Sequence, residues 1–596
     1  MTNKEISQLL RNIAAAYELL GESRFRIMAY QQAADSVENL AVDLRSVWEA
    51  GNLQKIPGIG GSLAQHLDEL FTNGESSHFT SIQKKIPAGV FDMLKLRNVG
   101  PKTAYRIAVE MGKRQTLGKT TYEKLNHILD THALLELDGF GEKREMEIRQ
   151  SLEHFLSGMN KKARLLYPEA SALANKLCEF IATNASVKSV TPLGSLRRKK
   201  ETIGDIDVAV STEDIPGTIE HTLTYPDITH VEDKGTSKIT VLLNNAVQAD
   251  VRFVEPEKYG AMVQYFTGSK YHNIRLREYA LQKGYSLSEY GIKIARGETK
   301  MYTFKTEREF YKFLGLDLIP PEMREDTGEI ELAEKHDLPV LVEETDIKGD
   351  LHIHSNFPYA SSHDLGRSSL DELAQKALLL NYEYIGISDH NPKFSGQTHR
   401  AINAVMKGRK KYYEQLLDSS RSVQKNTKKL KVYIMLEIDI RADGTLALPD
   451  DGFSYIDAAI VSIHASFEQA KDVMTARILR GLSYPKVKIF AHPTARKLGS
   501  REGIQADWPT IFDFCASHHI AIEINSSPQR LDLPDDLVRE AVQHGAMFII
   551  NTDSHHVDHM DLMTYGIGVA RRGWLQKRDI LNTRGQEEFE TWLLKG

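Results

Sequence analysis

Three aspartates in the middle of the chain have the spacing of a divalent-metal site. Asp205 and Asp207 stand one residue apart, and Asp250 alternates with apolar residues further on. Residues 206–210 and 248–253 both have the pattern of β-strands, and pairing them side by side would bring the three carboxylates together. Such carboxylates hold two cations, which stabilise the attacking and leaving oxygens of a phosphoryl transfer. We therefore predict that Asp205, Asp207 and Asp250 are catalytic and bind two Mg²⁺ ions.

The segment just before these aspartates carries groups that suit a triphosphate. It reads Gly-Ser-Leu-Arg-Arg-Lys-Lys-Glu-Thr-Ile-Gly-Asp-Ile-Asp over residues 194–207. Ser195, Arg198 and the backbone at Gly194 are the candidate phosphate ligands, and Gly204 belongs to the same nucleotide-binding string. An isolated Asp-x-Asp is more often a solvated strand edge, since charged residues are mostly exposed. The whole string has no such simple explanation.

Three short glycine-containing turns between helical segments indicate a second kind of phosphate contact. Glycines at a helix N-terminus let backbone N–H groups face a phosphate without a Cβ in the way. One such turn alone would be a helix C-cap, but three in similar contexts favour binding to the DNA backbone, which is independent of sequence. The candidate DNA-binding residues are Gly58, Gly60, Gly100, Lys102, Gly139 and Gly141.

The C-terminal part shows seven short apolar runs, nearly all ending in a residue that can bind a metal. Helical stretches lie between most of them, which favours a β/α barrel with its site at the C-terminal strand ends. Any one of these residues alone would be an ordinary core or surface group, but their recurrence at strand ends indicates a site. Mixed imidazoles and carboxylates suit Mn²⁺, Zn²⁺ or iron better than Mg²⁺ alone, with up to three ions. The candidate ligands are His352, His354, His390, Glu437, His464, His492, Asp553 and His555.

Composition sets limits on the other possibilities. A chain of 596 residues is too long for one hydrophobic core and predicts several domains. Its 41% hydrophobic and 26% charged residues are ordinary for a globular protein, and the net charge of -6 argues against a uniformly basic nucleic-acid coat. The two cysteines, Cys178 and Cys515, have no metal-type spacing and indicate a reducing compartment. No signal peptide or membrane-length apolar run is visible, so we expect a cytoplasmic protein.

The N-terminal half, residues 1–317, resembles the family X DNA polymerases. The resemblance rests on the string at 194–207, on Asp250-Val-Arg, and on Tyr-Phe-Thr-Gly-Ser-Lys-Tyr-His-Asn at 265–273, with the glycine turns resembling helix-hairpin-helix elements. It implies that Asp205 and Asp207 hold both metals and that Asp250 holds the catalytic one beside the primer 3′ hydroxyl. An isolated Tyr-Phe pair would be core aromatics. The remaining nucleotide-binding residues that the resemblance implies are Tyr265, Phe266, Gly268, Asn273 and Arg277.

The second half, from residue 349, resembles a polymerase and histidinol phosphatase (PHP) domain, which follows family X polymerases in bacteria. The resemblance implies a metal-dependent 3′–5′ exonuclease or phosphodiesterase. The family has an aspartate five residues after the second histidine of its first motif, but this chain has Tyr359 there. Asp364 is the candidate replacement if residues 356–363 contain an insertion. We keep open a barrel that is catalytically weak or structural, because one ligand is displaced.

One departure concerns deoxyribose-phosphate lyase activity. Family members with that activity carry a Schiff-base lysine where this chain has His66. Imidazole does not form the imine that a lysine amine forms. We therefore expect no lyase activity unless Lys55, Lys84 or Lys85 substitutes.

Taken together, we expect a multidomain protein with a helical N-terminal region, an α/β nucleotidyltransferase palm with a small thumb, and a distorted (β/α)7-type barrel. The expected function is gap-filling DNA synthesis in base excision repair with 3′-end processing. The expected partners are gapped or primed duplex DNA and dNTPs, with no membrane, for a nucleoid-associated bacterial monomer. Alternatives are a nucleotidyltransferase acting on a substrate other than DNA and a DNA-binding scaffold. The expected domains are 1–85 with the first hairpin, 86–158 with the other two, the palm 159–255, the thumb 256–317, a linker 318–348 and the PHP barrel 349–596.

Overall fold

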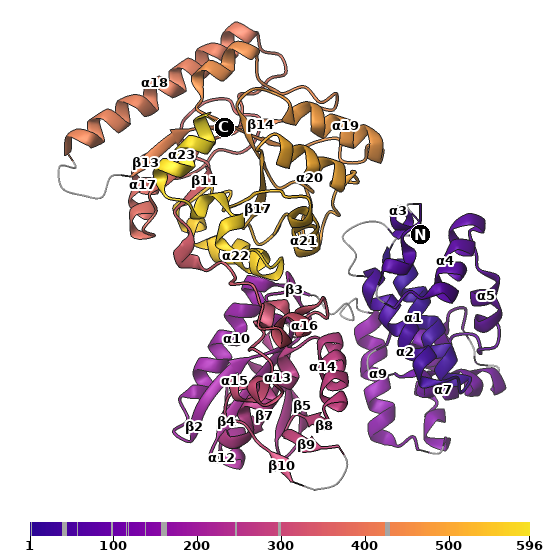
Figure 1. The fold of residues 1–596 in the computed structure, drawn as a ribbon. Helices are drawn as coiled ribbons and strands as arrows, with labels where there is room; N and C mark the ends of the chain where they lie inside the picture. Colours follow the sequence, from indigo (N-terminus) through magenta and orange to yellow (C-terminus); the bar gives the residue numbers. More distant parts are fainter. Residues whose placement is uncertain are drawn as a thin grey trace. The chain divides into compact units, whose positions relative to one another are not determined.

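A computed structural model describes the chain except for residues 2, 39–43, 50, 57, 97–98, 115, 117, 138, 157–163, 245–246, 296–299, 424–429 and 596. The chain forms two compact units, Met1–Ala163 and Arg164–Gly596 (Figure 1). Among the described residues, no helix has both the length and the apolar character that a membrane span requires.

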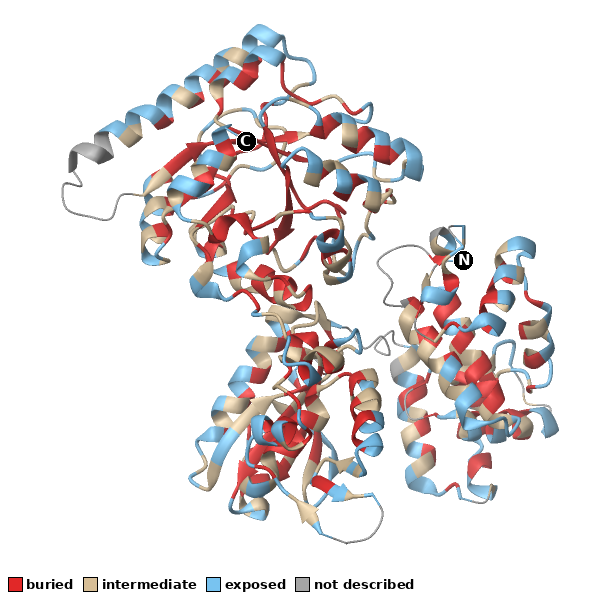
Figure 2. Cartoon of the chain, in the orientation of Figure 1, coloured by how far each residue is buried: buried red, intermediate tan, exposed pale blue. Residues whose placement is uncertain are grey.

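The N-terminal unit is helical, and its helices pack on one apolar core. Amphipathic helices such as α4 (Gly61–Asn73) bury one stripe, which includes Leu63, Leu67 and Leu70, and leave the other to solvent (Figure 2). The helices are α1 (Asn3–Leu19), α2 (Arg24–Glu38), α3 (Leu44–Glu49), η1 (Leu53–Lys55), α4 (Gly61–Asn73), α5 (Ser77–Gln83), α6 (Val90–Met93), α7 (Pro101–Lys113), α8 (Thr121–Asp130), η2 (Ala133–Glu136) and α9 (Glu142–Leu156).

The second unit begins with a five-stranded sheet in the order β2-β4-β7-β6-β5. The central pair, β4 and β7, is parallel, and the other pairs are antiparallel. The elements are β1 (Leu165–Leu166), α10 (Tyr167–Ala182), β2 (Val187–Pro192), α11 (Gly194–Arg197), β3 (Thr202–Ile203), β4 (Ile206–Thr212), α12 (Ile215–Leu223), β5 (Ile228–Lys234), β6 (Lys238–Leu243) and β7 (Val247–Val254). Apolar residues of α10 and of this sheet share one core, so the strand edge that carries the aspartates rests on a rigid support.

A smaller helical subdomain with a three-stranded antiparallel sheet, β10-β9-β8, follows. Its elements are η4 (Pro256–Lys258), α13 (Tyr259–Thr267), α14 (Lys270–Gln282), β8 (Tyr285–Ser288), β9 (Gly291–Ile294), β10 (Met301–Tyr302), α15 (Glu307–Phe313), η5 (Pro321–Met323), α16 (Glu329–Glu334) and η6 (Glu344–Asp346). The last three of these elements fall within residues 318–348, the segment expected to be a linker.

The structure differs from that expected linker. Ile319, Met323 and Ile330 of this segment are buried in the core of the preceding subdomain. Arg324 is fully buried, where its guanidinium pairs with Glu307 at 2.6 Å. The proline and acidic composition misled the sequence interpretation, because Glu322 and Glu325 of this segment pair with Arg571 and Arg572 and are not part of a solvated tether.

The C-terminal part is built of parallel strands in two sheets, β11-β12-β13 and β14-β15-β16-β17-β18. The strands are β11 (Gly349–Ile353), β12 (Tyr384–Ile387), β13 (Lys431–Ile434), β14 (Leu436–Asp439), β15 (Ala459–Ser462), β16 (Val487–Phe490), β17 (Ala521–Asn525) and β18 (Phe548–Asn551). Only Met435 separates β13 from β14, and backbone bonds join the end of β11 to Ser554 just beyond β18. The pairing therefore closes into a ring of strands.

Helices surround this ring, and the strands inside are almost entirely buried (Figures 1 and 2). They are α17 (Leu370–Leu379), α18 (His399–Val423), η7 (Asp450–Tyr455), α19 (Lys471–Leu482), α20 (Trp508–Ser517), α21 (Asp535–Gln543), η8 (Val557–Leu562), α22 (Met563–Arg572), η9 (Lys577–Asp579), η10 (Leu581–Thr583) and α23 (Gln586–Lys595). In parallel strands the carboxyl ends meet at one edge, which is where residues following each strand gather.

Candidate active sites

The structure brings the palm aspartates together on neighbouring strands. The parallel register of β4 and β7 places Asp207 directly opposite Asp250, and Asp205 immediately precedes β4. Burial raises the pKa of Asp207 to about 6, and the charges of Asp205 and Asp250 add to that increase against the opposing charge of Arg252. Three close carboxylates repel one another, which is the electrostatic situation that divalent cations relieve.

Asp250 differs from Asp207 in its partners. The Thr240 hydroxyl donates to its Oδ1 at 2.7 Å, and the Lys238 ammonium lies 3.1 Å from its Oδ2. Burial alone would raise the pKa of Asp250, but these hydrogen bonds and the Arg252 charge lower it overall. Arg252 also donates to Asp207 at 2.9 Å and stacks over the Phe266 ring at 3.9 Å. Asp250 is therefore held as an anion facing its neighbour.

The turn that begins at Gly194 lies against the same carboxylates. Gly194 has a φ of +59°, and a Cβ at this position would lie 2.7 Å from Asp207 Oδ2. Only glycine combines this backbone conformation with such a close approach. Ser195 is partly exposed in the following helix α11, and Arg198 closes that helix. At the other end of the string, a Cβ on Gly204 would lie 3.2 Å from Arg164 Nη1.

The predicted nucleotide-selection residues form one bonded group at the end of α13. The Asn273 side-chain amide donates to the Tyr265 carbonyl at 2.6 Å, and Arg277 Nε donates to the Asn273 carbonyl at 3.2 Å. Tyr265 and Phe266 contact edge to face, with ring centroids 5.0 Å apart. A Cβ on Gly268 would lie 2.8 Å from Asn273 Oδ1. The group is therefore preformed and continuous with Arg252 beneath Phe266.

The described residues of the three predicted hairpins have two features in common, although residues 57, 97–98 and 138 lie outside the described part. The apolar residue between the two arms, Ile59, Val99 or Phe140, is buried in each copy. Gly60 and Gly100 are the N-caps of α4 and α7, while Gly141 precedes α9. The candidate DNA-binding residues Gly60, Gly100, Lys102, Gly139 and Gly141 are exposed, and Gly58 is partly exposed with a φ of +85°. Each turn therefore offers a helix N-terminus to solvent.

The predicted barrel ligands converge at the carboxyl ends of the strands, with Glu437 at their centre. Its Oε2 lies 2.9 Å from His390 Nδ1 and 3.2 Å from His352 Nε2, and its Oε1 lies 3.0 Å from His492 Nε2. His354 and His464 approach the same carboxylate at 3.5 and 3.6 Å. Burial alone would raise the pKa of Glu437, but the surrounding histidines hold it well below the usual range.

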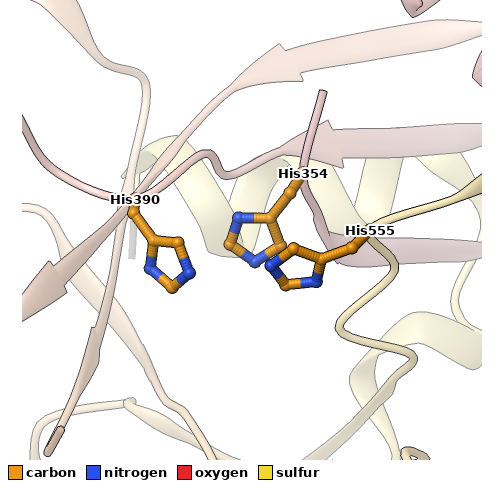
Figure 3. Close-up of side chains that lie close together, drawn as sticks. All are labelled: His354, His390 and His555. Carbon is orange, nitrogen blue, oxygen red and sulfur yellow. The ribbon is translucent and has the colours of Figure 1, made fainter. Parts of the chain in front are cut away.

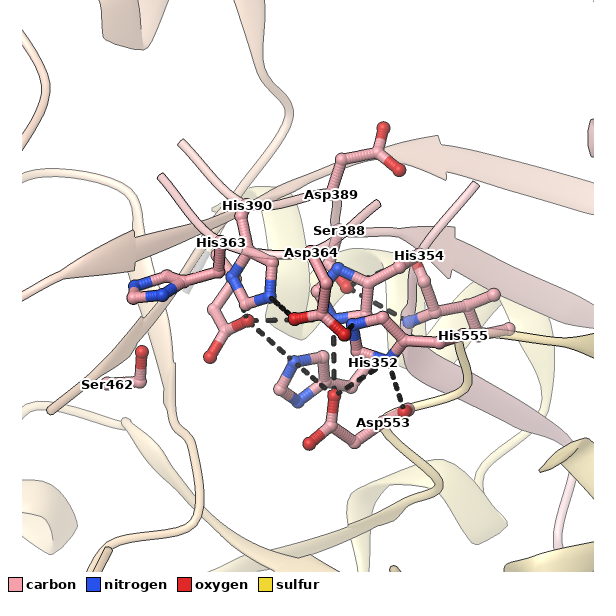
Figure 4. A network of polar contacts seen from close by, with 12 residues as sticks. His352, His354, His363, Asp364, Ser388, Asp389, His390, Ser462, Asp553 and His555 are labelled. Atoms are coloured by element: carbon pink, nitrogen blue, oxygen red, sulfur yellow. Dashed lines mark hydrogen bonds and ion pairs between the residues drawn. The ribbon is translucent and has the colours of Figure 1, made fainter. Parts of the chain in front are cut away.

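His354, His390 and His555 form the outer part of the cluster, and their rings face one another (Figure 3). Their ligand atoms lie within 4.8 Å of one another. Asp553 joins them to the centre, with Oδ1 3.2 Å from His354 Nε2 (Figure 4). Burial lowers the pKa of His354 to about 3 and that of His492 to about 4, so both imidazoles are neutral and suited to metal binding.

Buried polar atoms support a metal in this cluster. Among the described residues, seven buried side-chain atoms of this cluster have no hydrogen-bond partner. Buried polar groups without partners are costly and rare, and bound cations would satisfy several of these atoms. The seven atoms are His352 Nε2, His354 Nδ1 and Nε2, His390 Nδ1, Glu437 Oε2, His492 Nδ1 and His555 Nε2. The donor set of imidazoles and carboxylates fits Mn²⁺, Zn²⁺ or iron.

Asp364 lies at the rim of the cluster, and its side chain is 79% exposed. Its Oδ2 is 3.6 Å from His555 Nε2, and its Oδ1 is 3.9 Å from His390 Nε2. Burial would raise the pKa of Asp364, but the His555 and His390 charges lower it overall. Tyr359 instead donates its hydroxyl to the His390 carbonyl. The tyrosine thus supports the backbone of one ligand while the aspartate reaches the site.

A supporting layer behind the ligands was missed by sequence reasoning. Glu523, in the middle of β17, accepts from His352 Nδ1 at 2.7 Å and from the His492 backbone N–H at 2.7 Å. Asp439 lies 2.7 Å from His464 Nδ1 and 3.0 Å from His363 Nε2. Such carboxylates fix the orientation of metal-binding imidazoles. The available signal was a charged residue inside an otherwise apolar strand.

The backbone is also strained at two predicted ligands. His492 has a φ of +28° and Asp553 a φ of +55°, a region that side-chain-bearing residues rarely adopt. Such conformations persist where surrounding structure enforces them, and they cluster at functional sites.

The chain is similar to known DNA polymerases over all or half of its length. Over its full length the chain is 34% identical to the DNA polymerase/3′-5′ exonuclease PolX of Bacillus subtilis, covering 99% of that protein. The chain belongs to family X of the DNA polymerases. It is also 26% identical to DNA polymerase lambda of Arabidopsis thaliana and 24% identical to that of Rattus norvegicus. Each match covers 54% of this chain, with 62% and 56% of those proteins.

Two family X segments are also recognised by family models. Residues 1–76 match a helix-hairpin-helix domain, and residues 262–325 match the DNA polymerase beta thumb. The thumb match continues past residue 317, the expected end of the thumb, and includes buried Arg324. The packing described above explains this, because residues 319–325 are part of the thumb core.

His66 of this family X chain is half-hidden in the N-terminal unit. Its ring stacks on His78 with centroids 4.1 Å apart and an angle of 7° between the planes. Burial lowers the pKa of His66, and the neighbouring His78 lowers it further. The position is therefore a neutral stacked imidazole and carries no amine.

Proposed function

We propose that this polymerase fills short gaps in DNA at the palm and trims 3′ ends at the C-terminal barrel, as a base excision repair enzyme. The proposal rests chiefly on the register that sets Asp207 opposite Asp250 beside a glycine turn suited to a triphosphate. The full-length similarity to a protein named as both polymerase and 3′-5′ exonuclease supports the pairing of the two activities.

At the palm, Asp205, Asp207 and Asp250 would hold two Mg²⁺ ions, which supply charge stabilisation for the phosphoryl transfer and activate the primer hydroxyl. Ser195 and Arg198 are proposed to bind the triphosphate. Tyr265 and Phe266 would pack against the sugar of the incoming nucleotide, and Asn273 and Arg277 would face the minor groove of the new base pair. The preformed bonds of Asn273 to the Tyr265 carbonyl support a rigid pocket.

The barrel is proposed to be a PHP domain of (β/α)7 type. Its ligands would be His352, His354, Asp364, His390, Glu437, His464, His492, Asp553 and His555, holding up to three ions of Mn²⁺, Zn²⁺ or iron. The metals would supply a hydroxide for phosphodiester hydrolysis. Two observations support this assignment: buried imidazole nitrogens of the cluster have no hydrogen-bond partner, and the surrounding histidines lower the pKa of Glu437.

A cavity of about 460 Å³ opens beside the cluster and suits a DNA strand. Its charged residues other than the proposed ligands are all cationic: Arg367, Lys497, Arg501 and Arg530. Arg501 lies 3.9 Å over the ring of Phe467, which also lines the cavity. Cations that follow a backbone and an aromatic face for a base are the features that bind single strands. We propose that the 3′-terminal nucleotides enter here.

One experiment tests both activities together. A labelled gapped duplex is incubated with and without dNTPs, first in Mg²⁺ and then in Mn²⁺, and the products are separated on a gel. Extension in the presence of dNTPs and resection in their absence are the expected results. A chain that does neither would be a DNA-binding scaffold, and one that modifies only RNA or small molecules would be a different nucleotidyltransferase.

We also propose that the enzyme is a monomer and that it lies in the bacterial cytoplasm, associated with the nucleoid. Sedimentation of the protein with and without gapped duplex tests the monomer directly. A dimer in either condition would contradict the proposed monomer.

Lyase activity is not part of the proposed function. Since His66 offers no amine, borohydride should not trap the protein on nicked abasic DNA. Trapping would show that another lysine, such as Lys55, Lys84 or Lys85, forms the imine.

A further inference from the structure

Arg572, the last residue of α22 in the C-terminal barrel, contacts both the barrel and the polymerase half of the chain. Its side chain is only 1% exposed, and its Nη1 donates to the Arg198 backbone carbonyl at 2.9 Å. The same Nη1 lies 3.1 Å from Glu325 Oε1, and Nη2 donates to Asp535 at 2.6 Å. One barrel arginine thus joins two carboxylates to the backbone of the proposed triphosphate ligand.

Glu325 completes a second connection to Arg198. Its Oε1 accepts from Arg198 Nε at 3.0 Å and lies 3.6 Å from Lys200 Nζ. Although burial would raise the pKa of Glu325, the charges of Arg198, Lys200 and Arg572 hold it far below the usual range. Glu325 is therefore an anion whose position is set by cations from both parts of the chain.

Arg198 is consequently held at both its backbone and its side chain. Its Nη1 donates to the Thr267 carbonyl at 2.7 Å, and its Nε is occupied by Glu325. A guanidinium has five N–H donors, so these two bonds leave further donors for a phosphate. The side chain is 11% exposed. The direction of the Arg198 side chain is therefore fixed before a nucleotide binds.

We infer that Arg572 is a positioning residue for DNA synthesis, which acts from the barrel through Glu325 and Arg198 on the triphosphate of the incoming nucleotide. The inference rests on the proposed role of Arg198 as a triphosphate ligand. Removing Arg572 leaves Glu325 and Asp535 without the cation they share, and buried carboxylates that lose a partner rearrange. Arg198 then loses both its backbone anchor and the fixed position of its Nε acceptor.

The neighbouring arginine offers a matched control. Arg571 also joins the barrel to the polymerase half, since its Nε donates to Glu322 at 2.8 Å and its Nη1 to the Val342 carbonyl at 3.1 Å. Within the described part of the chain, no hydrogen bond or ion pair joins Arg571 to Arg198 or Glu325. Arg571→Met therefore removes the same charge from the same helix and weakens the same domain contact without touching the proposed path.

The test is steady-state gap filling by the full-length protein, with KM for the dNTP and kcat measured separately. Arg572→Met is expected to raise KM about tenfold, equivalent to about 1.4 kcal/mol of binding, with kcat little changed. Arg571→Met should keep a KM close to that of the unaltered chain. Resection of the same DNA without dNTPs should be unchanged in both variants, which shows that the barrel is folded. An equal effect of the two substitutions would overturn the inference.

A double-mutant cycle then tests the path itself. If Arg572 acts through Arg198, the Arg198→Met/Arg572→Met double variant should have the KM of Arg198→Met alone. Multiplied effects would mean that Arg572 acts independently, which overturns the inference. Arg572→Lys should recover only part of the loss, since an ammonium lacks the planar fork that reaches three acceptors. Failure of the proposed function would appear instead as no extension by the unaltered chain.

Discussion

The palm and the barrel both gather metal-binding residues, but they do so by different means. The palm uses three carboxylates on or beside the two paired strands β4 and β7 of one sheet, and the side chains of Asp207 and Asp250 are 24% and 15% exposed. Its charges are offset by Arg252 and Lys238, which bond to the same carboxylates. The barrel collects imidazoles and carboxylates from the ends of several strands, and most are fully buried.

This difference predicts when each site holds its cations. A few carboxylates bind Mg²⁺ together with substrate phosphates, so the palm is complete only once a nucleotide is present. The barrel cluster has enough donors of its own, and Glu523 and Asp439 behind them fix the imidazoles. We therefore expect the free protein to retain metal in the barrel and to lose it from the palm on dialysis.

The largest expected effect separates the two sites completely. Asp250→Ala should reduce nucleotide incorporation at least about 1,000-fold, because several kcal/mol of charge stabilisation depend on the palm metals. Resection in Mn²⁺ should be unchanged. Both are measured on the same labelled gapped duplex, with the exposed strand residue Asp233→Ala as the control. Equal loss of both activities would show that the two sites are not independent.

A substitution at the centre of the barrel cluster tests the other site. Glu437→Gln removes the charge that faces five histidines, and we expect resection to fall about 100-fold or more because the metal is lost. Elemental analysis of the dialysed protein should show reduced metal, while gap filling in Mg²⁺ continues. Exposed Glu468, substituted to glutamine, is the control. Metal content equal to that of the unaltered chain would contradict the proposal that Glu437 binds metal.

The palm was predictable from sequence because its information is local. The string at 194–207 and the strand with Asp250 need only one parallel pairing, and the structure has that register. The linker prediction for 318–348 failed because composition does not report tertiary partners. Glu325 looks like a solvated charge in the sequence, whereas in the structure it is bound by Arg198 and Arg572.

The barrel was predictable in outline but not in its support. Alternating strands and helices place His352 and Glu437 at one edge by a general rule of such folds. Glu523 could not be assigned, because it lies within a strand and meets His352 only after the ring closes across 171 residues. The same closure brings Asp364 to His555 and His390, which chain spacing alone left open.

We expect a smaller effect from a substitution at Glu523, one of the carboxylates that support the barrel imidazoles. Glu523→Gln keeps the shape but removes the charge that orients His352, and we expect metal affinity to fall about 10- to 100-fold. Titration of resection with Mn²⁺ measures this, and high Mn²⁺ should restore the rate. Asn551 donates to Oε1 of Glu523 and Asn525 donates to Oε2, so the glutamine variant keeps an acceptor for only one of them. A loss that excess Mn²⁺ does not restore would mean that the fold itself had changed.

The smallest expected effect comes from a substitution at Gly194, which tests whether the palm depends on the close approach of this residue to Asp207. Gly194→Ala places a Cβ against Asp207 Oδ2 and strains a residue with a φ of +59°. We expect kcat/KM for the dNTP to fall about tenfold, a cost of about 1.4 kcal/mol, because both the turn and the carboxylate must shift. Gly408→Ala, at an exposed position of α18 where a Cβ meets no atom within 4 Å, is the control and should leave dNTP use unchanged. A wild-type kcat/KM in Gly194→Ala would show that the palm, unlike the barrel with its strained His492 and Asp553, tolerates backbone adjustment at its metal site.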